Sequence, residues 1–205
     1  MSVELRDIVT DADRAAVLGL RRAPGQERYL GSMESHFEDA LADARACPRM
    51  WSIHAGDDLV GFVMISDGIP TETLAADDEL VGPYYLWRLL IDERFQGRGY
   101  GRAAVEAVAE YVRRRPGGDA LLTSCAAGDG SPLAFYLHCG FEPTGEVKWG
   151  EEILRLDFGA RTAPTARTAP TERIARTERI TPTSPRRAAT AARTAVEEPS
   201  IGGRG

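Results

Sequence analysis

A glycine-rich segment at residues 96–101, Gln-Gly-Arg-Gly-Tyr-Gly, has the composition of a site for a phosphorylated ligand. Glycines at 97, 99 and 101 permit positive φ angles and leave no side chain in the way of a ligand. An amphipathic stretch follows, and the first N–H groups of a helix have no partner within the helix. Because the helix dipole adds partial positive charge to those groups, this corner suits a pyrophosphate.

The spacing of the glycines does not fit two common phosphate-binding motifs. It fits neither the G-x-G-x-x-G dinucleotide fingerprint nor the G-x-x-x-x-G-K-[ST] P-loop, and tight strand-to-helix turns also use glycine for purely structural reasons. The segment 96–101 resembles the acetyl-CoA loop of the GNAT superfamily of N-acetyltransferases, whose usual form is Arg/Gln-x-x-Gly-x-Gly/Ala. The segment 136–141, Tyr-Leu-His-Cys-Gly-Phe, is similar to the helix-end signature of the same family.

The resemblance implies that acetyl-CoA is the co-substrate. The main chain of the strand before the loop is then expected to run beside the pantetheine amides, while the loop backbone holds the pyrophosphate. An N–H near Leu90 would polarise the thioester carbonyl. Arg98 and Arg102 either add charge-assisted contacts to phosphate or remain solvated at the surface. The cofactor-binding residues assigned in this way are Leu89, Leu90, Ile91, Gln96, Gly97, Arg98, Gly99, Tyr100, Gly101 and Arg102.

Tyr136 is the candidate catalytic residue. It occupies the tyrosine position of the signature, where the phenol in the family usually meets the CoA sulfur. A thiol has a pKa of about 8.5, so a modest acid suffices to protonate the departing thiolate. The alternative is a core tyrosine on one face of a short helix.

Two further polar residues have more than one possible role. Asp129 stands where many members of the family have an Asn that contacts pantetheine, and it either makes that contact or caps a helix over 131–139. Arg88, in an otherwise apolar strand, either forms a structural ion pair or binds an anionic group of the substrate. The stretch 87–92, which begins Trp-Arg, resembles the bacterial spermine/spermidine acetyltransferase subgroup.

The sequence does not identify a general base. Several members of the family place a Glu on the strand before the loop, but the corresponding positions here hold Tyr85, Trp87 and Arg88. One alternative is a carboxylate that acts through water, such as Glu34 or Glu79, and the other is an amine that arrives partly neutral. The residues assigned to the substrate are Arg88, Tyr85 and Glu34.

Apolar periodicity predicts the elements that position these residues. Helices are expected at 10–22, 29–47, 100–115 and 131–139, and residues 69–83, acidic and with two prolines, are expected to form a loop. The order predicts an α/β fold with a mixed, mostly antiparallel central sheet and helices on both faces. The resemblance adds a splayed central strand pair, 84–92 and 120–125, which admits the pantetheine arm. Strands are expected at 3–9, 50–55, 59–66, 84–92, 120–125, 141–147 and 152–158.

Composition divides the chain at residue 159. Residues 1–159 have globular composition, with 27 acidic and 16 basic side chains and a net charge of −11, and are expected to form one N-acetyltransferase domain. Residues 160–205 are rich in Arg, Thr, Pro and Ala, with a net charge of +5, and we expect a disordered tail because they have too few large apolar residues to offset the entropy of ordering. The arginines of the tail are evenly spread and no aromatics interleave with them, so no nucleic-acid partner is expected.

The remaining composition argues for a protein of the cytoplasm. Three cysteines without paired spacing and three histidines argue against a disulfide framework or a metal site. The N-terminus lacks the pattern of a signal peptide, and no stretch approaches the ~20 apolar residues that span a bilayer, so no membrane contact is expected. The family resemblance is also compatible with a homodimer.

The expected activity is acetyl transfer from acetyl-CoA to a primary amine of a small molecule, such as a polyamine, an amino-acid-like compound or an antibiotic, by direct attack in a ternary complex. The acidic body favours a cationic acceptor. Two alternatives stay open: a catalytically silent acyl-CoA-binding module, and a protein or peptide acetyltransferase. Closure of the site by residues 24–35 and 69–83 would favour a small molecule, whereas an open groove would favour a peptide.

Overall fold

The computed structural model describes residues 2–77 and 79–158, so the expected tail at 160–205 and the boundary at 159 lie outside the described residues. The strands are β1 (Glu4–Asp7), β2 (Pro48–Ala55), β3 (Asp58–Asp67), β4 (Tyr84–Ile91), β5 (Ala120–Cys125), β6 (Glu142–Lys148) and β7 (Glu151–Asp157). The helices are α1 (Asp11–Leu18), α2 (Met33–Ala42), α3 (Thr71–Ala76), α4 (Tyr100–Arg113) and α5 (Leu133–His138), with short 3-10 turns at Gln26–Arg28, Ala44–Ala46 and Glu93–Phe95.

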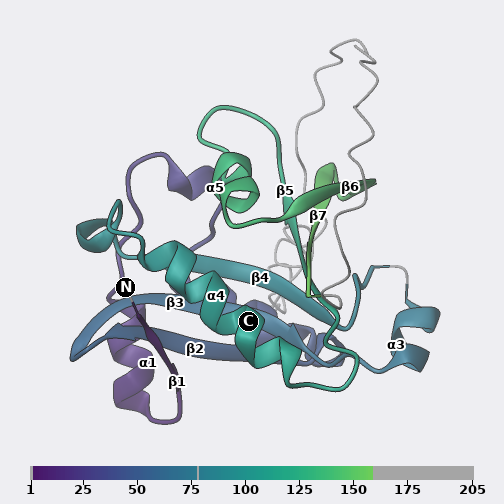
Figure 1. Cartoon of the computed structure of the whole chain (residues 1–205). Helices are drawn as coiled ribbons and strands as arrows, with labels where there is room; N and C mark the ends of the chain where they lie inside the picture. The colour runs from purple at the N-terminus through teal and green to yellow at the C-terminus, as the bar shows by residue number, and fades with distance from the viewer. Residues whose placement is uncertain (1, 78, 159–205) are drawn as a thin grey trace, which may run out of the picture.

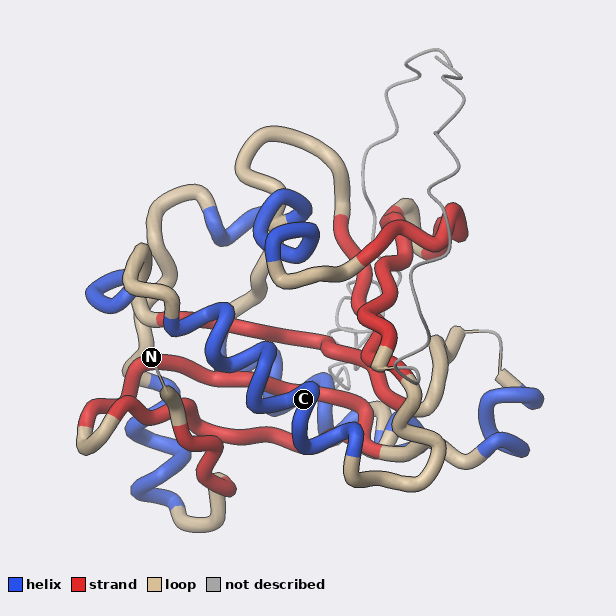
Figure 2. Tube along the Cα trace, viewed as in Figure 1, coloured by secondary structure: helices blue, strands red, loops and turns tan. Residues whose placement is uncertain are grey.

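The strands form one sheet in the order β1-β2-β3-β4-β5-β7-β6, antiparallel except for β4 and β5. Among the described residues, these two central strands pair at a single register position, Tyr85 opposite Leu122. The Thr123 hydroxyl then donates to the Leu86 carbonyl at 3.1 Å. Beyond that point the strands diverge, with β4 continuing along β3 while β5 turns toward β6 and β7 (Figures 1 and 2). The mixed α/β sheet and its splayed strand pair are therefore confirmed.

Helices cover both faces of the sheet, and each face has its own apolar core. On one face α4 lies across the sheet (Figure 1) and buries Val105, Val108 and Val112 at helical spacing, together with Tyr136 of α5. On the other face, the end of α1 and α2 pack against Phe62 and residues of β4. Tyr85 and Trp87 belong to this second core, so neighbouring residues of β4 serve opposite faces.

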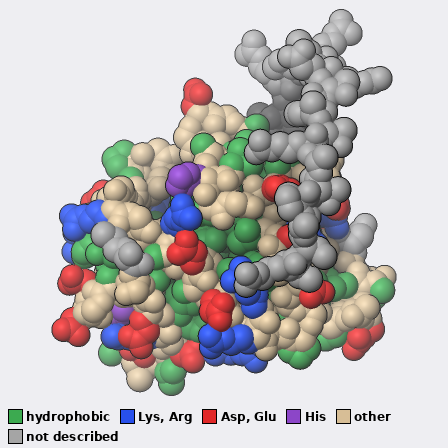
Figure 3. Space-filling view, in the orientation of Figure 1, with side chains coloured by type: hydrophobic (Ala, Val, Ile, Leu, Met, Phe, Trp, Pro, Cys, Tyr) green, Lys and Arg blue, Asp and Glu red, His purple; other side chains and the backbone are tan. Residues whose placement is uncertain are grey.

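Charged side chains of both signs are interspersed on the outer face over α4 (Figure 3). Helix α4 contributes i,i+4 pairs, Arg102 with Glu106 and Arg114 with Glu110. Such exposed pairs stabilise the helix only slightly because water screens them. None of the helices in the described part of the chain has the length and apolar composition needed to cross a bilayer.

Several boundaries differ from expectation. The second helix begins at Met33 instead of residue 29, because Ser32 caps it by accepting a hydrogen bond from the Ser35 N–H at 3.1 Å. The first helix starts with the expected Thr10 capping box but ends at Leu18. The expected loop over 69–83 contains α3, which begins directly after Pro70. Proline fits there because the first turn of a helix needs no N–H from it.

Candidate active site

A cavity of about 840 Å³ lies beside the gap between β4 and β5. Tyr85 and Leu89 of β4 line it, as do Thr123 and Ser124 of β5 and Tyr136 of α5. Tyr85 belongs to the core on the α1–α2 face and Tyr136 to the core on the α4 face. The cavity therefore connects the two faces of the sheet through the gap, which allows two reactants to approach from opposite sides.

The glycine corner holds the backbone as its composition predicts. Gly97 has φ of 73°, and Gly99, the N-cap of α4, has φ of 81°, in the left-handed region that favours glycine. A Cβ atom at either position would meet nothing within 4 Å, so the space over this turn is open to a ligand. Gly101 has a different role: a Cβ there would lie 3.1 Å from the Phe135 ring, so this glycine allows α4 and α5 to pack closely.

The side chains of the corner make contacts within the protein. The Arg98 guanidinium lies over the Phe95 ring at 5.6 Å, and the Tyr100 ring meets the same phenylalanine edge-on at 6.3 Å. Arg102 pairs with Glu106 at 2.9 Å. Arg98 and Arg102 are both exposed, which agrees with either of their alternatives. The main-chain N–H groups that open α4 are thus the better placed donors for an anion.

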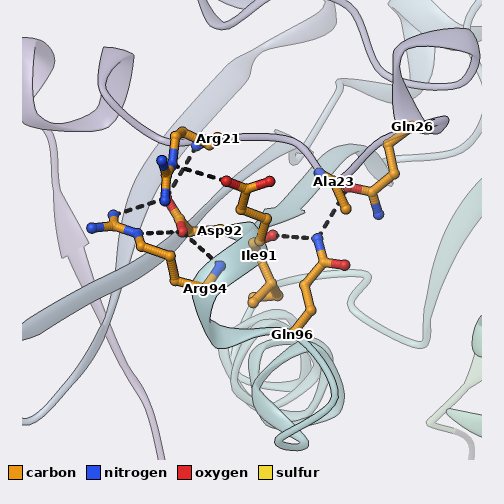
Figure 4. A network of polar contacts seen from close by, with 8 residues as sticks. Arg21, Ala23, Gln26, Ile91, Asp92, Arg94 and Gln96 are labelled. Atoms are coloured by element: carbon orange, nitrogen blue, oxygen red, sulfur yellow. Dashed lines mark hydrogen bonds and ion pairs between the residues drawn. The ribbon is translucent and has the colours of Figure 1, made fainter.

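Gln96 fastens the corner to the loop after α1. Its Nε2 donates to the Ile91 carbonyl at 2.8 Å and to Gln26 Oε1 at 3.0 Å, and the same Gln26 oxygen accepts from the Ala23 N–H at 3.0 Å (Figure 4). The amide of Gln96 and the carbonyl of Ile91 are therefore engaged with the protein. Their contribution is to the shape of the corner.

Asp92 forms the second tie between these segments (Figure 4). Its fully buried carboxylate accepts from the Arg21 N–H at 3.1 Å, from the Arg94 N–H at 2.9 Å and from the Arg94 guanidinium at 2.7 and 2.9 Å. The hydrogen bond from Arg94 is the main reason why the pKa of Asp92 falls from 3.8 to about 2. Asp92 is not among the residues predicted from the sequence, although it directly follows β4.

The main chain of β4 borders the gap. Its residues Leu89, Leu90 and Ile91 pair on one side with Val63, Phe62 and Gly61 of β3. On the other side, the described part of β5 pairs with β4 only at Tyr85, so this edge faces the gap. The Leu90 side chain is 1% exposed in the core, whereas Leu89 lines the cavity.

Tyr136 is 8% exposed and reaches the cavity wall. The rings of Phe135 and Phe141 lie edge-on to it, with centroids at 5.3 and 5.4 Å. Burial raises the pKa of the Tyr136 phenol above its ordinary value, and a hydrogen bond with Thr123 opposes the shift in part. The phenol is consequently protonated at neutral pH and acts as a hydrogen-bond donor.

Arg88 forms the structural ion pair that was one of its two alternatives. Its guanidinium pairs with Asp39 at 3.2 Å, donates to His36 Nδ1 at 3.2 Å and donates to the Trp87 carbonyl at 2.8 Å. Burial, followed by the nearby Arg88 charge, lowers the pKa of His36 to about 3, so the imidazole is neutral and accepts. Arg88 and Asp39 line the cavity with these contacts in place.

The capping alternative for Asp129 is wrong, and Glu34 lies away from the cavity. Asp129 does not cap α5; the Ser131 hydroxyl accepts from the Leu133 N–H at 3.3 Å instead. The Asp129 main-chain carbonyl accepts from the Tyr29 hydroxyl at 2.7 Å, which joins this loop to the loop before α2. Glu34 lies on the exposed side of α2, outside the set of described residues that line the cavity.

Three residues that line the cavity were not predicted from the sequence: Ser124, Trp149 and Glu151. The Tyr85 hydroxyl donates to Ser124 Oγ at 2.6 Å, and Ser124 Oγ donates to Glu151 Oε2. All three residues line the cavity. Trp149 lies edge-on to Tyr85 at 6.3 Å and donates to Glu79 Oε2 at 2.6 Å. Within the described residues, no group of three or more His, Cys, Asp or Glu side chains could hold a metal ion.

Comparisons with known proteins agree with this geometry. The model of the acetyltransferase (GNAT) family matches residues 14–141. A spermine/spermidine N(1)-acetyltransferase of Bacillus subtilis strain 168 is 29% identical over 157 residues, covering 75% of this chain and 97% of that protein.

Two solved structures with coenzyme A share the fold. An aminoglycoside acetyltransferase has a TM-score of 0.59 at 18% identity, covering 77% of this chain and 95% of its own. An N-acetyltransferase from Thermoplasma acidophilum has a TM-score of 0.52 at 14% identity, covering 77% of this chain and 100% of its own. The chain therefore belongs to the GNAT family and is an acetyl-CoA-dependent N-acetyltransferase.

Proposed function

We propose that the protein transfers the acetyl group of acetyl-CoA to a primary amine of a cationic small molecule, by direct attack in a ternary complex. The observation that carries this proposal is the cavity through the β4–β5 gap, which has Tyr136 on one side and Tyr85 on the other. A thioester in the gap would present its sulfur to Tyr136 and its carbonyl carbon to the opposite side. Direct attack follows because the amine can approach the face of that carbonyl, add to its carbon and expel the thiolate from the tetrahedral intermediate.

The binding of acetyl-CoA is assigned mainly to the backbone. The N–H groups of Gly99, Tyr100 and Gly101 at the start of α4 would hold the pyrophosphate in the open turn. The gap-facing main chain from Leu89 to Ile91, apart from the Ile91 carbonyl that Gln96 engages, would pair with pantetheine, and an N–H near Leu90 would donate to the thioester oxygen. The contact of the Asp129 carboxylate with pantetheine stays a prediction, because Tyr29 engages only the main-chain carbonyl of that residue.

Tyr136 would donate its hydrogen bond to the leaving sulfur. The C–N bond forms, the C–S bond breaks, and the phenol gives its proton to sulfur while the proton lost by the new amide nitrogen restores it. Burial keeps the phenol protonated, so it remains a hydrogen-bond donor to the sulfur throughout the physiological pH range.

The cavity wall favours a small acceptor over a peptide. Residues 26–32, from the loop after α1 to the cap of α2, line the cavity, and the loop is tied to the glycine corner through Gln96 and Asp92. The segment 24–35 thus supplies one part of the closure that favours a small-molecule acceptor, whereas no described residue of 69–83 lines the cavity. Glu27 and Glu151 supply negative charge along the same wall, which Arg28 also lines, and Asp39 is paired with Arg88 there. Tyr29 and Trp149 supply aromatic faces.

An extended polyamine is the acceptor class that these features fit best. Ammonium groups separated by apolar methylenes can use carboxylates and aromatic faces in alternation. The relative from Bacillus subtilis named above bears the name of a spermine/spermidine acetyltransferase, which supports the same class.

The test is an amine panel with detection of the released thiol. It includes spermidine, spermine, an aminoglycoside, free amino acids and a peptide with a free N-terminus. We expect thiol release with a polyamine, and a reduction of kcat by about 10²-fold in Tyr136→Phe with unchanged affinity for acetyl-CoA. Binding of acetyl-CoA without thiol release for any amine would show a catalytically silent binding module instead. Preference for the peptide would show a protein acetyltransferase.

A further inference from the structure

A continuous hydrogen-bond chain connects the cavity to a carboxylate two strands away. Tyr85 of β4 donates to Ser124 of β5 at 2.6 Å, and Ser124 donates to Glu151 at the start of β7. Each residue comes from a different strand, and the sheet order β4-β5-β7 places them in sequence. The chain lies on the wall of the cavity, on the face opposite Tyr136.

The amine acceptor must lose a proton before it can attack the thioester. An alkyl ammonium has a pKa of about 10.4, so nearly all of it is protonated at neutral pH and has no lone pair for attack. The thioester carbonyl lies beside β4 in the proposed complex. Strands are spaced by about 4.8 Å, so the backbone of β7 lies about 10 Å from β4, and the Glu151 carboxylate needs a bridge to reach the reacting nitrogen.

On the basis of the proposed acetyl transfer, we infer that Tyr85, Ser124 and Glu151 form a proton relay that deprotonates the amine. The Tyr85 oxygen accepts a proton from the ammonium as its own proton passes to Ser124 Oγ, and the Ser124 proton passes to the Glu151 carboxylate. The amine is left neutral, and Glu151 is left as a carboxylic acid that later releases its proton to water. Tyr85 and Ser124 end each transfer neutral.

In this relay Tyr85 contacts the substrate, whereas Ser124 and Glu151 act through it. Glu151 is accordingly a positioning residue and terminal proton acceptor, not a second contact to the reacting nitrogen. Its surroundings include charges of both signs. The ionisable groups that face it or share its cavity are Lys148 across the β6–β7 pair, Cys125 on β5, Tyr85 on β4, Tyr136 on α5, and Glu27, Arg28, Tyr29, Asp39 and Arg88 elsewhere on the wall.

The experiment is the pH profile of kcat/KM for the amine in Glu151→Gln, Ser124→Ala and Tyr85→Phe, with Glu152→Gln as the matched control. Glu152 is the next residue on β7, and the same chemical change is made there outside the cavity lining. At pH 7 we expect losses of about 10²-fold in the three relay variants. The losses should shrink as the pH rises toward the pKa of the free amine, because a growing share of the amine is then already neutral in solution. Glu152→Gln should retain the wild-type profile.

Calorimetric titration with coenzyme A confirms that each variant is folded, and Ser124→Ala tests the relay with the smallest change if Glu151→Gln fails to fold. A raised KM for the amine with an unchanged pH profile in Glu151→Gln would overturn the relay and make Glu151 a binding group. Wild-type activity in Ser124→Ala at pH 7 would overturn it as well. If the wild-type protein acetylates no amine, the proposed function fails and the relay fails with it. If the wild type is active and either overturning result is found, the relay alone fails.

Discussion

Replacing Asp92 with Asn should destabilise the protein by an amount that depends on pH. The carboxylate has a pKa of about 2 in the folded chain, against an ordinary value of 3.8, mainly because Arg94 hydrogen-bonds to it. This difference corresponds to roughly 2 kcal/mol, and solvent screening of the half-exposed Arg94 reduces it to about 1–2 kcal/mol. A depressed pKa contributes stability above the unfolded value of 3.8, and that stability is lost as the pH falls through about 2.

The measurement is urea denaturation of the wild type and Asp92→Asn at pH 7, 5.5, 4 and 3. The difference in unfolding free energy should be constant from pH 7 to 5.5 and should narrow below about pH 4 as the wild-type carboxylate loses its advantage. Glu110→Gln, which breaks an exposed helix pair, is the control and should change stability less. A difference that persists undiminished at pH 3, or that is absent at pH 7, would refute the electrostatic reasoning.

Three further changes test other parts of the site. Gly99→Ala should cost about 1 kcal/mol in unfolding free energy, because φ of 81° is strained for a residue with a Cβ, and should also weaken coenzyme A binding by calorimetry. Gln96→Ala removes one hydrogen bond to Gln26 of the loop and one to the Ile91 carbonyl of β4, and should cost about 1–2 kcal/mol by urea denaturation. His36, whose pKa falls from 6.5 to about 3 on burial, should make wild-type stability decline below about pH 6.5, by about 2 kcal/mol at pH 5, and His36→Gln should flatten that part of the profile.

Local patterns predicted the corner and its supporting elements well. The glycines at 97 and 99 have the positive φ angles that their types suggest, and the apolar spacing of α4 matches its buried face. The expected roles of Leu89 to Ile91 and Tyr136 agree with a gap and a cavity wall, respectively, and their contact with acetyl-CoA stays a prediction.

Features that depend on distant partners were not predicted. Asp129 has a good capping residue type, but Pro132 is the N-cap of α5, and the Leu133 N–H donates to the Ser131 hydroxyl. Pro70 reads as a breaker in sequence, yet it precedes α3. Glu151 meets Ser124 only because Cys125 pairs with Glu152 across β5 and β7, a register that no short segment of the sequence specifies.

Because β4 and β5 pair incompletely, stability and activity place opposite demands on this part of the sheet. Each ladder hydrogen bond that the two strands forgo would have contributed about 0.5–1.5 kcal/mol, so a variant that zipped them together would resist denaturation better. The same variant would have nowhere to seat a thioester. Selection for thermal resistance alone would thus be expected to yield inactive proteins in which β4 and β5 pair fully. Stabilising substitutions in the two cores or on the helix surfaces would leave catalysis intact.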